Sequence, residues 1–108
     1  MQSWYTEADV TALSLVSATP VKMGAYSITN VSGGTTFVQF FDAAATSDVT
    51  LGTTLPAWQQ FVGSGLANEA HFTSSGLLFK NGLVIAATTA SHGGTEEAAG
   101  VDISIGYD

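Results

Sequence analysis

The segment Val101-Asp102-Ile103-Ser104-Ile105-Gly106-Tyr107 decides the fold class, because apolar and polar residues alternate in it almost without exception. A period of two places the apolar set on one face of a β-strand and the polar set on the other. Similar runs recur upstream, at 11–17, 23–31, 35–42, 49–51, 55–62, 70–73, 77–80 and 83–86. No window of helical length holds a sustained apolar stripe. Roughly eight short strands predict an all-β fold, an antiparallel β-sandwich or a jelly roll.

Two glycine-containing turns separate pairs of these runs. Ser32-Gly33-Gly34 follows the run at 23–31, and Asn81-Gly82 follows the run at 77–80. Asn-Gly favours a two-residue turn in which both residues have positive φ. We therefore predict that each turn closes a hairpin of two hydrogen-bonded strands.

The N-terminal residues differ from the rest of the chain. Trp4 and Tyr5 lie there, and two acidic residues interrupt any apolar face before the alternation begins. We predict an extended N-terminal arm over residues 1–10 and a single β-sandwich domain over residues 11–108. The acidic residues also stand where a secretory leader would carry lysine or arginine, so no leader is expected.

The charge balance restricts the partners. Nine residues are acidic and only Lys22 and Lys80 are basic, which gives a formal net charge of -7. Nucleic acids and anionic membrane surfaces are bound through clusters of cations, so we expect neither partner. Only 10% of the residues are charged, whereas 45% are hydrophobic. Two interpretations fit: a monomer kept soluble by hydroxyl groups and acidic repulsion, or a surface covered by neighbouring subunits, where charge is depleted.

The aromatic residues supply candidates for such an interface. Between residues 36 and 41, Phe37 and Phe41 fall on one face of the predicted strand, and Val38 and Phe40 on the other. One face of this strand fills the core, so the other meets another layer or a subunit. Tryptophan and tyrosine are favoured interface anchors. The candidate interface residues are Trp4, Tyr5, Phe37, Phe41 and Trp58.

The titratable residues form no motif typical of catalysis or metal binding. His71 and His92 have no partner at metal-ligand spacing. The acidic pairs Glu96-Glu97 and Asp42 with Asp48 do not follow the spacing of a calcium loop, and we interpret them as solvated loop charges. No serine lies in a nucleophile elbow. The sequence therefore predicts a non-enzymatic protein without catalytic residues, cofactor or metal.

A series of short motifs runs in order along most of the chain. Its members are Asn30-Val31-Ser32-Gly33, residues 36–42, Leu55-Pro56-Ala57, residues 76–82, the loop at 95–100 and a last strand ending in Tyr107. This order resembles small phage virion structural proteins. The resemblance implies a β-sandwich that decorates or cements the capsid on the outer surface of the phage particle, after synthesis in the host cytoplasm. In that family the middle loop is richer in proline than residues 43–48.

The leading hypothesis is a structural subunit that adds buried area at the junctions of a shell and stabilises it by mass action. Its expected partners are the major capsid protein or other virion subunits, and further copies of itself in a dimer or trimer. A structural protein of the neck or tail is an alternative in the same class. A carbohydrate-binding module is an alternative in another class, since many small β-sandwiches are lectin-like.

Overall fold

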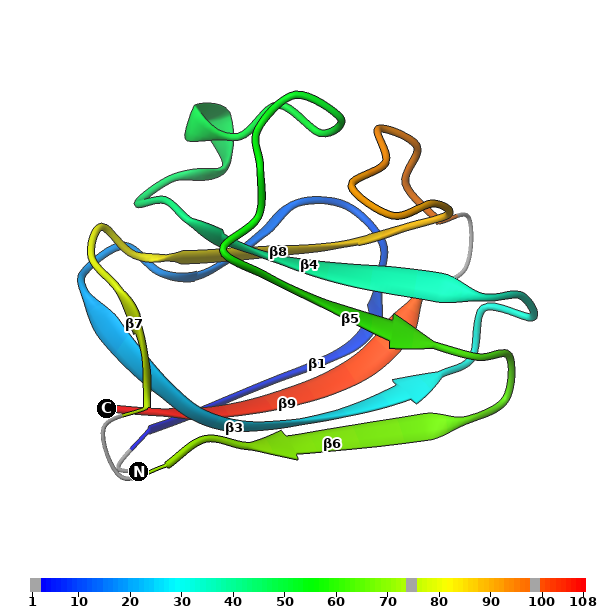
Figure 1. Ribbon diagram of the computed structural model, residues 1–108, viewed down its shortest axis with the longest axis horizontal. Coiled ribbons are helices and arrows are strands. Elements are labelled where there is room, and N and C mark those ends of the chain that lie inside the picture. Colours follow the sequence, from blue (N-terminus) through cyan, green and yellow to red (C-terminus); the bar gives the residue numbers. More distant parts are fainter. Residues whose placement is uncertain (1–2, 74–75, 98–99) are drawn as a thin grey trace.

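The computed structural model describes residues 3–73, 76–97 and 100–108, which form two sheets packed face to face (Figure 1). Sheet 1 contains β1 (Ser3–Val10), β3 (Val21–Asn30), β6 (Ala67–His71), β7 (Leu77–Phe79) and β9 (Val101–Tyr107). Sheet 2 contains β2 (Ser14–Ser17), β4 (Thr36–Asp42), β5 (Trp58–Val62) and β8 (Leu83–Thr88). A short 3-10 turn, η1 (Thr46–Asp48), follows β4.

The strand order is that of a jelly roll. Sheet 1 runs β1-β9-β3-β6 and sheet 2 runs β2-β8-β4-β5, and every pairing is antiparallel. Because β6 and β7 pair with successive parts of the same edge of β3, the described strands fill eight positions. Successive strands mostly alternate between the sheets, as in the two Greek keys of this fold. The predicted all-β sandwich is confirmed, in its jelly-roll form.

The main core lies between the sheets and is built from their inward-facing side chains. Val101, Ile103 and Ile105 of β9 are buried, as their alternation predicts. Tyr26 of sheet 1 stacks on Phe40 of sheet 2, with ring centroids 5.0 Å apart. Each such buried side chain contributes about 1.5–3 kcal/mol through removal from water, so the two sheets hold each other in place.

A second, smaller core covers the outer face of sheet 2. The loops that follow β4 and β8 lie over this face (Figure 1). Its buried members are Phe41, Ala43, Val49, Val84 and Ala86. The loops approach each other closely, since a Cβ atom added to Gly52 would lie 3.2 Å from the Cα of Gly94. This cover explains why both faces of β8 are buried.

Both predicted hairpins are wrong, because each glycine turn connects the two sheets. Ser32-Gly33-Gly34 leads from β3 in sheet 1 to β4 in sheet 2, and Asn81-Gly82 leads from β7 to β8. Gly82 has φ of +154°, whereas Asn81 is not at positive φ. A Cβ at Gly82 would lie 2.5 Å from the carbonyl oxygen of Ser17 and 2.6 Å from that of Ala43. The corner requires glycine because two backbone segments pass beside it.

The predicted N-terminal arm is also corrected, because residues 3–10 form strand β1 at the edge of sheet 1. Tyr5 and Val10 pack against the main core. A bulge interrupts the alternation at Asp9, which has φ of +55°. The Asp9 amide donates to the Asp102 carboxylate at 2.9 Å, and the Asp9 carboxylate accepts from the Gly100 amide at 2.7 Å. The proposed boundary between residues 10 and 11 therefore falls inside the jelly roll.

Other elements differ from prediction in their limits. Residues 49–51 lie in the loop between η1 and β5 instead of in a strand, and the strand expected at 70–73 lies at Ala67–His71. The apolar residues at 49–51 are explained by the second core. No helix in the described part of the chain is long and apolar enough to cross a membrane.

Candidate interaction surface

The five predicted interface residues lie in different environments. Trp4 is 59% exposed on the outer face of sheet 1, while Tyr5 points to the main core. Phe37 is half-buried on the outer side of sheet 2, and Trp58 is 38% exposed at the edge of that sheet. Phe41 is fully buried in the second core. Phe41 is therefore removed from the candidate interface, since the protein's own loop covers it.

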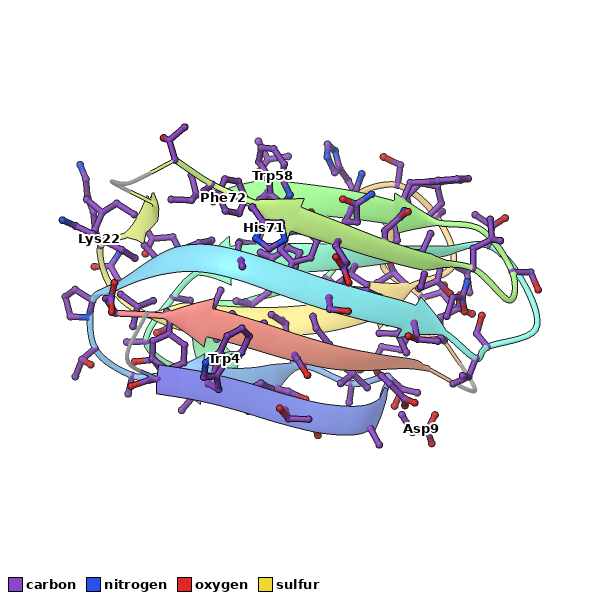
Figure 2. All side chains as sticks on the ribbon, turned by 90° about the horizontal axis from the view of Figure 1, so that it is seen from below. Trp4, Asp9, Lys22, Trp58, His71 and Phe72 are labelled. Atoms are coloured by element: carbon purple, nitrogen blue, oxygen red, sulfur yellow. The ribbon has the colours of Figure 1, made fainter. Side chains whose placement is uncertain are left out.

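Two pairs of aromatic rings lie along β5, at the edge of sheet 2. Trp58 meets Phe72 edge to face with centroids 5.3 Å apart, and Phe61 meets Phe37 in the same way at 5.4 Å. Figure 2 shows Trp58 and Phe72 together beyond β6. Phe61 is 54% exposed and Leu66, in the turn between β5 and β6, is 60% exposed. We call Phe37, Trp58, Phe61, Leu66 and Phe72 the aromatic edge.

Trp58 is held by hydrogen bonds that link the two sheets. Its indole N–H donates to the Tyr26 hydroxyl at 2.9 Å, and that hydroxyl donates to Gln60 Oε1 at 2.6 Å. Burial raises the pKa of Tyr26, which keeps the hydroxyl protonated and able to donate. A ring fixed before binding loses little conformational freedom when a partner covers it.

The backbone of this edge is partly protected by side chains. The Phe61 carbonyl accepts from the Gln60 side chain at 2.8 Å and from the Asn68 side chain at 2.7 Å. Free backbone groups at a sheet edge invite another strand, and bonds of this kind reduce that tendency. A partner is therefore expected to contact the apolar side chains of the aromatic edge and not to add a strand to its backbone.

The outer face of sheet 1 has a different chemistry. Strand pairing arranges its outward residues in rows: Trp4, Gly106, Ala25 and His71; then Thr6, Ser104, Ser27 and Glu69; then Asp102, Thr29 and Ala67. Hydroxyl, carboxylate and small side chains dominate these rows, and Trp4 is their one large aromatic residue. We call these eleven residues the polar face.

A shallow hollow of about 250 Å³ lies on the polar face between β1, β9 and β3. Thr6, Ser27, Thr29, Asp102 and Ser104 contribute polar groups to its lining. Trp4 lies one row away and projects over β9 (Figure 2). An exposed indole therefore lies one row away from a hollow whose lining includes several hydrogen-bonding groups.

Tyr5 and Glu7 form a hydrogen bond with each other within β1. The Tyr5 hydroxyl donates to the Glu7 carboxylate. Burial, together with this carboxylate, raises the pKa of Tyr5 above its ordinary value. The predicted role of Tyr5 as an anchor on a free arm is replaced by a role in attaching β1 to the fold.

The remaining titratable residues do not assemble into a metal centre. Among the residues that the structure describes, no group of three or more His, Asp or Glu side chains is placed to hold an ion. Asp42 and Asp48 line the same surface hollow, where Asp42 accepts from the Asn81 amide at 2.8 Å. Glu97 accepts a hydrogen bond from the Thr36 hydroxyl, so it is more than a solvated loop charge.

Comparison with known proteins adds little to this picture. The sequence matches no established protein family and no curated protein sequence. Among solved structures, the Tobacco streak virus coat protein superposes on 98% of this chain and 85% of its own, with a TM-score of 0.45 and 12% sequence identity. A similarity at this level does not assign a family or a function.

Proposed function

We propose that this protein is a non-enzymatic structural subunit of a virus particle, and that the aromatic edge is its assembly surface. The observation that carries the proposal is the exposure of Phe61 on the edge strand β5 and of Leu66 in the turn that follows it, since the same strand carries Trp58, which a hydrogen bond holds in place. Large aromatic side chains are enriched at the centres of protein interfaces, where charged residues are depleted. The low charge content of the whole chain agrees with extensive contact between subunits.

The finer form of the proposal is a decoration or cement protein on the outer surface of a phage capsid. It is supported by the order of sequence motifs and by the jelly-roll topology, an architecture that viral capsid domains use. The partner is the major capsid protein, and the subunit forms a dimer or trimer that matches a symmetry axis of the shell. A position in the neck or tail uses the same surface with another virion protein.

The test measures how strongly the parent chain and two variants bind to empty shells of the capsid protein encoded in the same genome. The purified chain should sediment with these shells and should self-associate at micromolar concentration. Phe61→Ser should weaken shell binding about tenfold or more, as expected for a central interface aromatic. Leu78→Ser is the matched control, because Leu78 is 49% exposed on β7, away from the aromatic edge.

Two results contradict the proposal. A strictly monomeric chain that does not sediment with any virion component would remove the structural role. Equal shell binding by Phe61→Ser and the parent would keep that role but move the assembly surface away from the aromatic edge.

A further inference from the structure

We propose that the polar face of sheet 1 binds neutral carbohydrate, with a sugar ring stacked on Trp4 and its hydroxyl groups bonded in the adjacent hollow. This inference does not rest on the structural role in a virion. It uses the opposite side of the domain from the loops that cover sheet 2 (Figure 1).

The first support is the position of Trp4. The Trp4 indole is 59% exposed on a regular strand and makes no hydrogen bond or ring contact with the residues that the structure describes. Its cross-strand neighbour is Gly106, and the missing side chain leaves room for the indole above β9. Trp4 thus stands on a rigid sheet, where an aromatic plane can stack against the apolar face of a sugar ring.

The second support is the row of polar groups beside that indole. The hydroxyls of Thr6 and Ser104 lie 3.3 Å apart in the hollow. Thr29 and Glu69 contribute further donors and acceptors, and neither side chain is bonded to another described residue. Sugar hydroxyls both donate and accept, so a surface of mixed hydroxyl and carboxylate groups complements them.

The third support is charge, which selects the class of sugar. The three rows contain the carboxylates of Glu69 and Asp102 and no lysine or arginine. Anionic glycans, phosphates and nucleic acids would meet like charge there, with no lysine or arginine in these rows to offset it. Neutral saccharides have no such penalty. The polar face and the aromatic edge therefore suit different partners.

The experiment titrates the full chain with neutral di- and trisaccharides of glucose, galactose and N-acetylglucosamine, by calorimetry and tryptophan fluorescence. We expect at least one saccharide to bind, and heparin, an anionic control, not to bind. Trp4→Ala should weaken that binding about tenfold. Ser27→Val, which replaces a hydroxyl in the hollow, should also weaken it. Leu15→Ala, at an exposed apolar residue of β2, should leave it unchanged.

Two variants separate this inference from the structural proposal. Trp4→Ala should weaken sugar binding and leave shell binding unchanged, whereas Phe61→Ser should weaken shell binding and leave sugar binding unchanged. The inference is overturned if no saccharide binds, if binding survives both Trp4→Ala and Ser27→Val, or if Trp4→Ala changes the oligomeric state without any effect of sugar. The last result would assign the polar face to a contact between proteins.

Discussion

Replacing Gly82 with alanine tests the corner that joins the two sheets. The added Cβ would lie 2.5 Å and 2.6 Å from the carbonyl oxygens of Ser17 and Ala43, well inside van der Waals contact. Both atoms are backbone, so a side-chain rotation cannot relieve the clash. Overpacking of this kind costs about 1–3 kcal/mol, and the strained φ of +154° adds roughly 1–3 kcal/mol.

We therefore expect Gly82→Ala to lower the free energy of unfolding by about 2–6 kcal/mol. At roughly 4 °C per kcal/mol for a domain of this size, the melting temperature should fall by about 8–24 °C. Urea and thermal unfolding followed by circular dichroism provide the measurement.

Two other glycines separate the causes of this effect. Gly33 has φ of +86° with open space around it, so Gly33→Ala should show the backbone strain alone. Gly34 has open space and no positive φ, so Gly34→Ala should be neutral or slightly stabilising. If Gly82→Ala unfolds at the same urea concentration as Gly34→Ala, the tight corner is refuted. If it matches Gly33→Ala instead, only the φ angle matters and the backbone segments are not in close contact.

Three further outcomes are expected. Deleting residues 1–9 should destabilise the domain by roughly 3 kcal/mol or more, because β1 and the buried part of Tyr5 are lost. A urea midpoint equal to that of the parent would instead support the interpretation of these residues as an arm outside the domain. Phe41→Ala should cost about 3–5 kcal/mol in unfolding experiments, whereas Phe61→Ala, which removes a half-exposed ring and its contact with Phe37, should cost about 1 kcal/mol. Similar losses for the two variants would show that the exposure of the two rings is misassigned. Stability should fall as the pH rises above about 10, because unfolded tyrosine ionises there while Tyr26 and Tyr5, with raised pKa values, stay protonated in the fold. Tyr26→Phe should make this decline shallower, and an unchanged slope would contradict the role of burial.

The alternation of apolar and polar residues predicted which side chains of a strand face the core better than it predicted which strands pair with each other. Residues 101–107 lie in a strand as predicted, because burial of one face imposes a period of two. Residues 36–42 also lie in a strand, with large apolar residues on both faces because the second core covers the outer one. Which strands pair depends on how the two sheets pack, and the residues of a local turn do not reveal this. Asn81-Gly82 therefore connects one sheet to the other, although its residue types predict a hairpin within one sheet.

The misplaced interface residues have a similar cause. The apolar pattern around Phe41 correctly indicated a second covering layer, but that layer is the chain's own loop. β1 was not predicted because its bulge at Asp9 breaks the alternation and its edge position tolerates acidic residues. Phe61 was missed because its contact with Phe37 depends on the pairing of β4 with β5, and Phe72 because its contact with Trp58 depends on how the two sheets meet in space. Trp58, the predicted residue that they flank, was the available signal.

The pairing of β1 with β9 also affects how the chain acquires its structure during synthesis. Strand β1 is synthesised well before residues 101–107, the strand with which it pairs. β3 likewise needs β9 for one of its edges. Contacts so distant in sequence must close a long loop before they add stability, which slows folding. Until residues 101–107 have been made, Tyr5 and the apolar side of β3 lack the cover that β9 provides, so the yield should depend on chaperones that hold the nascent chain.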